Sequence, residues 1–245
     1  MILLVDIGNT ATSFASLDNE ELKFINRLFN IDVNKDSVSN LLNGFKFEKI
    51  YVSSVAPKLL SQLKEILINL FKIKPIEIDV SFNDLVDIDI DNKNELGIDL
   101  LCDIVAGKAI YGNKVVIIDF GTATKVLFID ENGVFSSCAI YPGYQKSKEL
   151  LANSTELLPN VEGKLIKPIS ECHNTSDVIN SSIYFSHIDT INGIINRYEN
   201  EKGYSLKRVY TGGNALDFIP ELVKRSEYDE MLLFKGMALL INRGK

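Results

Sequence analysis

The chain has 245 residues, of which 46% are hydrophobic and 24% are charged, and its formal net charge is −7. This composition is ordinary for a globular protein with a sizeable core. The acidic balance, without any block of Lys or Arg, argues against a nucleic-acid or membrane-surface partner.

Three cysteines without C-x-x-C spacing indicate neither a disulfide framework nor a zinc site. They favour a reducing, cytoplasmic compartment. The four apolar residues before Asp6 are too few for a signal peptide. No apolar run approaches the ~18 residues that a membrane span needs.

The first half of the chain begins with a predicted strand, residues 2–6, that ends on Asp6 and is followed by the turn residues Gly8 and Asn9. Two further apolar runs, residues 11–17 and 22–29, predict strands that complete a meander. Helices are then predicted over 36–42, 57–71 and 100–111, and strands over 49–53 and 75–79.

The second half repeats this order from residue 115. A predicted strand over 115–119 ends on Asp119 and is followed by Gly121 and Thr122. Apolar runs over 125–129 and 134–141, helices over 145–152, 176–200 and 231–241, and a strand over 208–211 complete the half. A duplicated unit is therefore expected. It predicts an α/β fold with two domains, residues 1–112 and 113–245, each a mixed sheet flanked by helices.

An Asp-x-Gly turn after a strand suits polyphosphate binding. Glycine lets the backbone approach phosphate oxygens, and neighbouring threonines can donate hydrogen bonds. The aspartate repels phosphate but can hold a cation, such as Mg²⁺, that bridges to it. One such turn also occurs in ordinary hairpins. Two copies, at Asp6 and Asp119, predict two loops that face each other and clamp a nucleotide.

Other nucleotide and catalytic patterns are missing. The sequence has neither a G-x-x-x-x-G-K-[ST] loop nor a G-x-G-x-x-G run after a strand. His173 and His187 fit no Ser-His-Asp or Cys-His pattern. Asp99 has two interpretations, and its spacing alone favours the second. It is either a general base for phosphoryl transfer or the N-cap of a helix beginning at Leu100.

Eight short motifs follow one another along nearly the whole chain. They are Asp6–Thr10 (D-x-G-N-T), Ser53–Pro57 (S-S-V-x-P), Gly97–Leu100 (G-A-D-R), Asp119–Thr124 (D-F-G-T-A-T), Ala139–Gly143 (A-I-x-P-G), Thr155–Pro159 (T-A-K-L-P), Asn174-Thr175 (G-x-N-T) and Thr211–Gly213 (T-G-G). In content and order they resemble the motifs of type III pantothenate kinases, members of the acetate kinase–Hsc70–actin superfamily. The resemblance implies duplicated actin-like (ribonuclease H-like) domains.

It also implies a cytoplasmic homodimeric enzyme. Such an enzyme uses ATP, Mg²⁺ and a monovalent cation (K⁺ or NH₄⁺) to phosphorylate pantothenate to 4′-phosphopantothenate, the first step of coenzyme A biosynthesis.

The resemblance further implies roles for individual residues. Asp99 would be the catalytic base, Asp6 would serve Mg²⁺ through the phosphates, and Asp119 would hold the monovalent cation. The residues expected to bind ATP are Asp6, Ile7, Gly8, Asn9, Thr10, Ala11, Thr12, Ser13, Gly121, Thr122, Gly212 and Gly213. Those expected to bind pantothenate are Ile90, Gly97, Ile98, Asp99, Leu100 and Thr175.

The acceptor side departs from the family pattern. Leu100 stands where the family has an arginine that pairs with the pantothenate carboxylate, and Ile90 stands where it has a tyrosine. Losing such a charge-assisted contact costs ~1.5–3 kcal/mol. Either another cation, Lys93 or Lys125, replaces it, or the acceptor differs. Two alternatives therefore stay open: a kinase for another small hydroxylated metabolite, and a non-catalytic nucleotide-binding regulatory factor. The retained Asp99 argues against the second.

Overall fold

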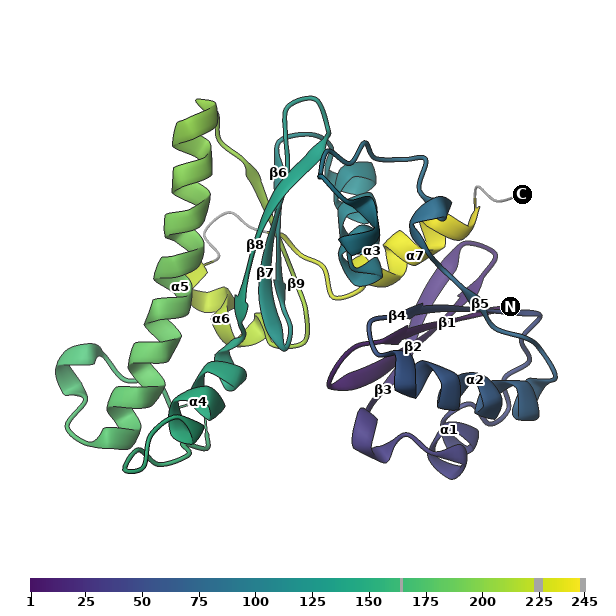
Figure 1. The fold of residues 1–245 in the computed structure, drawn as a ribbon, viewed down its shortest axis with the longest axis horizontal. Helices are drawn as coiled ribbons and strands as arrows, with labels where there is room; N and C mark the ends of the chain where they lie inside the picture. Colours follow the sequence, from purple (N-terminus) through teal and green to yellow (C-terminus); the bar gives the residue numbers. More distant parts are fainter. Residues whose placement is uncertain (164, 223–226, 243–245) are drawn as a thin grey trace. The chain divides into compact units, whose positions relative to one another are not determined.

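The computed structural model describes residues 1–163, 165–222 and 227–242 (Figure 1). Its contacts divide the chain into two compact units. Unit 1 comprises residues 1–113, residues 129–136 and the C-terminal segment from Met231, and unit 2 comprises residues 114–128 and 137–230. The duplicated domains predicted at 1–112 and 113–245 remain a proposal about how the chain is organised.

Unit 1 contains a five-stranded sheet with the order β3-β2-β1-β4-β5. β1 (Ile2–Ile7), β2 (Ala11–Asp18) and β3 (Glu21–Phe29) form an antiparallel meander. β4 (Lys49–Ser54) pairs with β1 in parallel, and β5 (Ile76–Glu77) pairs with β4 in parallel. Asp6 therefore lies on the central strand, in register with Ser13 of β2 and Ser53 of β4.

The helices of unit 1 are α1 (Lys35–Leu41), α2 (Pro57–Phe71), α3 (Ile98–Ala106), which continues as a π-helical turn over Gly107–Tyr111, and α7 (Leu232–Asn242). Short 3₁₀ turns lie at Asn30–Asp32, Val80–Phe82 and Lys93–Glu95. Leu63 and Leu67 of α2 pack against β1 in the core of unit 1, as the leucine periodicity of this helix indicates.

Unit 2 has the strand order β10-β9-β6-β7-β8. Its strands are β6 (Val115–Phe120), β7 (Ala123–Ile129), β8 (Phe135–Pro142), β9 (Lys207–Thr211) and β10 (Glu227–Tyr228). β6, β9 and β10 run parallel. Counted from the first strand of each group, both sheets have the order 3-2-1-4-5, so the topology repeats as the duplicated sequence rhythm predicts.

The helices of unit 2 are α4 (Tyr144–Asn153), α5 (Thr175–Lys202) and α6 (Ala215–Leu222), with a 3₁₀ turn at Ile169–Glu171. Aromatic rings join them to the sheet. The ring of Phe128 on β7 stacks on Tyr198 of α5 with centroids 4.2 Å apart, and Phe120 on β6 stacks on Phe218 of α6 at 4.9 Å. Across the described residues, no helix has both the length and the apolar character needed to cross a bilayer.

Candidate active site

The predicted phosphate loop of unit 1 joins β1 to β2. The Gly8 amide donates to the Ala11 carbonyl (3.0 Å), which closes the turn, and Asn9 and Thr10 are exposed at its tip. A Cβ on Gly8 would lie 3.2 Å from that carbonyl oxygen, so the turn leaves little room for a side chain. The loop thus presents a short stretch of backbone and two polar side chains, as phosphate binding requires.

Thr12 and Ser13 follow this loop on β2, and their side chains bond to the protein interior. Both are buried. The Thr12 hydroxyl donates to Asn30 Oδ1 (2.9 Å), and the Ser13 hydroxyl accepts from Arg27 Nε (3.0 Å). In this structure the two hydroxyls are therefore directed toward the protein, whereas Thr10 is exposed.

Asn30 is a supporting residue that was not predicted from the sequence. Its backbone amide donates to the Thr10 carbonyl (2.9 Å), and its side-chain Nδ2 donates to the Gly8 carbonyl (2.9 Å). With the bond from Thr12, one side chain thus ties together both ends of the loop. The sequence offers no signal for this role, because Asn after a strand is an ordinary turn residue.

Replacing Asn30 with Ala is expected to raise the KM for ATP about 5- to 30-fold, because the loop loses side-chain bonds worth about 1–2 kcal/mol together. Initial rates at varied ATP concentration measure this effect. Asn26→Ala is the matched control. Asn26 lies on β3, the strand that leads into Asn30, and its side chain accepts a hydrogen bond from the exposed amide of Arg27 (2.8 Å). The KM of Asn26→Ala for ATP should therefore stay unchanged. Equal effects of the two changes would contradict the bracing role.

Asp99 lies in the first turn of α3, where Gly97 is the N-cap residue. Its Oδ1 accepts from the Leu100 amide (2.9 Å). The interpretation of Asp99 as the helix cap is therefore wrong, because α3 begins at Ile98 and Gly97 is its N-cap residue. A carboxylate in the first turn is stabilised by the positive end of the helix dipole. A Cβ on Gly97 would lie 2.5 Å from Asp99 Oδ1, so a larger residue at position 97 would clash with this carboxylate.

Three carboxylates act on one buried thiol in unit 1. The pKa of the Cys102 thiol is raised well above its usual value, first by burial and then by the negative charges of Asp6, Asp103 and Asp99. The predicted phosphate-loop aspartate and the predicted base therefore lie in electrostatic range of the same group. Asp103, which is buried, was not predicted, although its i,i+4 spacing from Asp99 places both on one face of α3.

These carboxylates suit a magnesium ion that arrives with a nucleotide. Mg²⁺ is commonly held by one or two carboxylates together with substrate phosphates and water. In the part of the chain that the structure describes, no three His, Cys, Asp or Glu side chains are arranged to hold an ion by themselves. Asp6, at the end of β1 and next to the loop, is the side chain that would face the ion.

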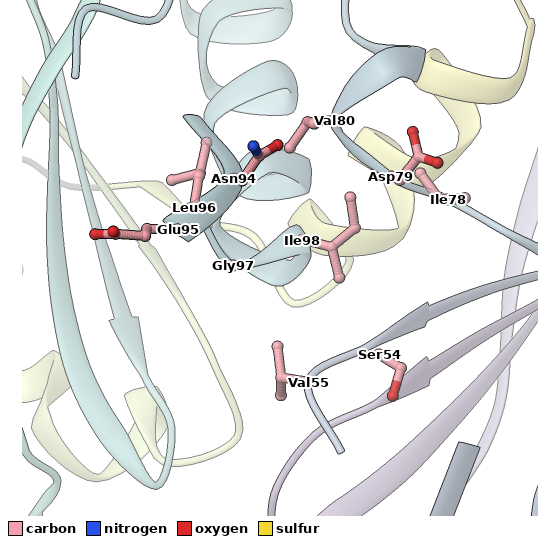
Figure 2. A pocket seen from close by; sticks show the side chains of 10 residues that line it. All are labelled: Ser54, Val55, Ile78, Asp79, Val80, Asn94, Glu95, Leu96, Gly97 and Ile98. Carbon is pink, nitrogen blue, oxygen red and sulfur yellow. The ribbon is translucent and has the colours of Figure 1, made fainter. Parts of the chain in front are cut away.

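A pocket of about 380 Å³ lies beside the start of α3. Figure 2 shows it between the segment that leads into α3 and the turn that follows β4. Its lining consists of Ser54, Val55, Ile78, Asp79, Val80, Asn94, Glu95, Leu96, Gly97 and Ile98. These ten described residues include two carboxylates and no lysine or arginine.

The predicted acceptor residues are placed unevenly. Gly97 and Ile98 line the pocket, whereas Leu100 is a buried residue of α3 and is not part of the lining. Ile90 is half-buried beside the bridge that pairs Ile88 with Phe135. Thr175 belongs to unit 2, where it is exposed as the first residue of α5.

In unit 2, Asp119 and Gly212 meet at the end of β6. Asp119 is in register with Thr211 of β9, and Gly212 follows with φ of +92°. A Cβ on Gly212 would overlap Asp119 Oδ1 and lie 2.6 Å from the Phe120 amide nitrogen. Only glycine therefore combines this backbone conformation with such a close approach.

The second predicted phosphate loop packs on the Pro142-Gly143 turn. The Gly143 amide donates to the Thr122 carbonyl (2.9 Å), and a Cβ on Gly143 would overlap the Gly121 carbonyl oxygen. His187 of α5 lies behind this turn with Nε2 3.0 Å from the Pro142 carbonyl oxygen. The motif segments Asp119–Thr124, Ala139–Gly143 and Thr211–Gly213 are thus brought together within unit 2.

Asp119 also carries an ion pair. Lys125 Nζ lies 2.7 Å from Asp119 Oδ2, and the two side chains are only 16% and 13% exposed. Lys125 is on β7, the neighbour of β6 in the sheet. Lys125, predicted as a possible partner for an acceptor carboxylate, pairs with Asp119 in the structure.

Comparisons with known proteins identify the family to which the chain is similar. A model of the type III pantothenate kinase family matches residues 2–197. A type III pantothenate kinase from Geobacillus thermodenitrificans is 30% identical over 254 residues, covering 99% of this chain and 98% of its own length.

Two solved structures share the fold. A Campylobacter jejuni protein named as a Baf family transcriptional activator has a TM-score of 0.60 at 24% identity, over 99% of this chain and 98% of its own. A Sinorhizobium meliloti protein named as a 2-dehydro-3-deoxygalactonokinase has a TM-score of 0.59 at 8% identity, over 99% and 96%. With the repeated strand order, they confirm the predicted α/β fold of two actin-like mixed sheets.

Proposed function

The chain belongs to the type III pantothenate kinase family, and we propose on this premise that it transfers the γ-phosphoryl group of ATP to the hydroxyl group of pantothenate. The product is 4′-phosphopantothenate, and the reaction opens coenzyme A biosynthesis. The observation that carries the proposal is the position of Asp99 in the first turn of α3. Besides burial, the negative charges of Asp6 and Asp99 both raise the pKa of the Cys102 thiol, so the two carboxylates lie near the same group.

The residues divide the chemistry between them. The backbone of residues 8–10 and of residues 121–122 binds phosphate oxygens. Asp6 would hold the nucleotide's magnesium ion, which would supply charge neutralisation at the phosphates. Asp99 accepts the acceptor's hydroxyl proton while the hydroxyl oxygen bonds to the γ-phosphorus. The bond from that phosphorus to the bridging oxygen breaks, and ADP leaves with the electron pair.

The remaining ATP contacts follow the motif positions. Ala11 completes the first loop, and the buried Ile7, Thr12 and Ser13 support it from the protein side. Gly212 and Gly213 of the T-G-G segment are further expected nucleotide contacts. The family resemblance also implies a monovalent cation, K⁺ or NH₄⁺, at Asp119. In the structure, Lys125 Nζ lies 2.7 Å from that carboxylate and already supplies a positive charge there.

We further propose that the pocket beside α3 receives the acceptor. Its volume lies within the range of small-molecule sites. Because its lining carries Asp79 and Glu95, an acceptor carboxylate is expected to point away from it. Lys93, exposed next to the lining residue Asn94, is the candidate partner for that carboxylate, since Lys125 is paired with Asp119.

A second candidate function is phosphorylation of an uncharged hydroxylated metabolite. It is favoured by the buried, apolar Leu100 at the family's arginine position and by the two carboxylates in the pocket lining. None of the ten lining residues is a lysine or arginine that could pair with an acceptor's carboxylate. The acceptor experiment below separates the two functions.

The enzyme is proposed to act as a cytoplasmic homodimer. Unit 2 exposes large apolar side chains near α4 and α5, which a second copy could cover. They are Ile140, Leu150, Leu157, Leu165, Ile169 and Val178. A molar mass of about twice 27.4 kDa in solution is the corresponding observation.

The function is tested by turnover with Mg²⁺, KCl and ATP. We expect labelled pantothenate to be converted to a product heavier by one phosphoryl group, as seen by mass spectrometry, and the Asp99→Asn variant to form almost none. A panel of hydroxylated metabolites, followed by ADP release, runs in parallel. Release with uncharged acceptors alone would favour the second candidate. ATP binding by calorimetry without any turnover would instead support a regulatory role.

A further inference from the structure

The ion pair between Lys125 and Asp119 changes what the second phosphate loop can bind. Asp119 ends the central strand of unit 2, and Lys125 reaches it from the neighbouring strand β7 with Nζ 2.7 Å from Oδ2. Both side chains are mostly buried, at 16% and 13% exposed. The pair is therefore better shielded from water and salt than an ordinary surface ion pair.

The residues around Asp119 do not fit an added monovalent cation. Oδ2 is engaged by the ammonium, and Oδ1 lies so close to Gly212 that a Cβ there would overlap it. A K⁺ ion on this carboxylate would also sit next to a like charge in a partly buried site, which is unfavourable. The Lys125 ammonium already supplies a positive charge beside this carboxylate.

We propose that the Lys125 ammonium is a resident cation that takes the place of K⁺ or NH₄⁺ at Asp119, so that nucleotide binding and turnover do not depend on a monovalent cation. The chemistry is equivalent. The lysine head group is a compact ammonium with three donors and one positive charge. Because it is tethered to β7, it remains at the loop at any salt composition.

Lys125 acts in this scheme as a positioning residue. It holds the Asp119 carboxylate against Gly212, and the backbone of Phe120 then continues into the turn at Gly121 and Thr122. The Asn214 amide supports the same turn through the Phe120 carbonyl (3.1 Å). A lost charge at Lys125 should therefore weaken nucleotide binding, and an external cation should restore it.

The test compares KCl, NH₄Cl and choline chloride at equal ionic strength. The inference rests on the proposed kinase function, so two readouts are used: the ADP-induced rise in Tm, which needs no acceptor, and pantothenate-dependent kcat/KM. For the wild-type protein, we expect the ADP-induced rise in Tm and the kcat/KM each to stay within about twofold across the three salts. If ADP raises the Tm but pantothenate is not phosphorylated, the proposed acceptor is wrong. The rise in Tm in the three salts then still tests whether nucleotide binding needs a monovalent cation.

The variants sharpen the result. Lys125→Thr is expected to lose about 10- to 150-fold in ADP affinity in choline chloride, the loss typical of a charge-assisted contact. It should recover in KCl or NH₄Cl, while Lys125→Arg should remain independent of the salt. Lys146→Thr is the matched control, because it removes an exposed pair with Glu149 (2.8 Å) in the same unit. It should create no salt requirement.

Two results would overturn the inference. One is a wild-type protein whose ADP-induced rise in Tm disappears when K⁺ is replaced by choline. The other is a Lys125→Thr variant that binds ADP equally well in every salt. If Lys125→Thr does not unfold cooperatively, the wild-type and Lys125→Arg measurements decide the question by themselves.

Discussion

The Asp99→Asn variant is expected to lose about 10²- to 10⁴-fold in kcat/KM, the usual contribution of a positioned general base. Asparagine is nearly the same size and can still accept from the Leu100 amide, as Asp99 Oδ1 does (2.9 Å). The helix start should therefore persist. What the variant lacks is a basic oxygen that takes up the acceptor's proton.

The measurement is steady-state turnover together with the ADP-induced rise in Tm. Nucleotide binding should stay within a few-fold of wild type, because the change affects the acceptor's proton and leaves the phosphate loop in place. Asp36→Asn is the matched control, since Asp36 is an exposed carboxylate in the first turn of α1 in the same unit. Its kcat/KM should be unchanged. An Asp99→Asn enzyme that keeps a tenth of wild-type activity would remove Asp99 from the mechanism.

Gly236→Ala is expected to destabilise the protein by about 2–3 kcal/mol, a typical value for overpacking a buried contact. Gly236 of α7 is buried and rests directly on the backbone of α3, where a Cβ would overlap the Cys102 carbonyl oxygen and lie 2.7 Å from the Cys102 Cα. Backbone on both sides cannot rotate away, so the helices must separate. Because α3 carries Asp99, the shift should also lower activity.

Gly193→Ala makes the same chemical change with the opposite expected sign. Gly193 lies inside α5, is exposed, and has no atom within 4 Å of the position where a Cβ would sit. Alanine there should stabilise the protein by about 0.5–1 kcal/mol through helix propensity. Urea unfolding followed by circular dichroism measures both variants. If both shift the midpoint in the same direction, helix packing at Gly236 is not the cause.

Much of the secondary structure could be predicted from local patterns. The helix predicted over 57–71 coincides with α2, and the strand predicted over 115–119 lies within β6. Periodicity and turn residues suffice there because each pattern belongs to one element. The helix predicted over 100–111 starts earlier, at Ile98, and its last turn is π-helical. α6 was not predicted.

The site was predicted less completely, for a physical reason. Asn30 and Asp103 are ordinary polar residues in the sequence, and their roles appear only when β3 returns to the loop and when α3 is buried. The pairing of Lys125 with Asp119 depends on the order of β6 and β7 in the sheet. The C-terminal helix was assigned to the second half by chain order, whereas its contacts place it in unit 1 on α3.

The sequence by itself determined the family and predicted the two phosphate loops and Asp99, because short motifs and strand ends are local features that a single chain displays in order. Only the tertiary structure decided which groups neutralise and support them. Asp119 meets an ammonium, Asp6 and Asp99 act on one thiol, and Leu100 is buried in α3. Such relations join residues through packing and charge across strands and helices, and linear spacing does not record them.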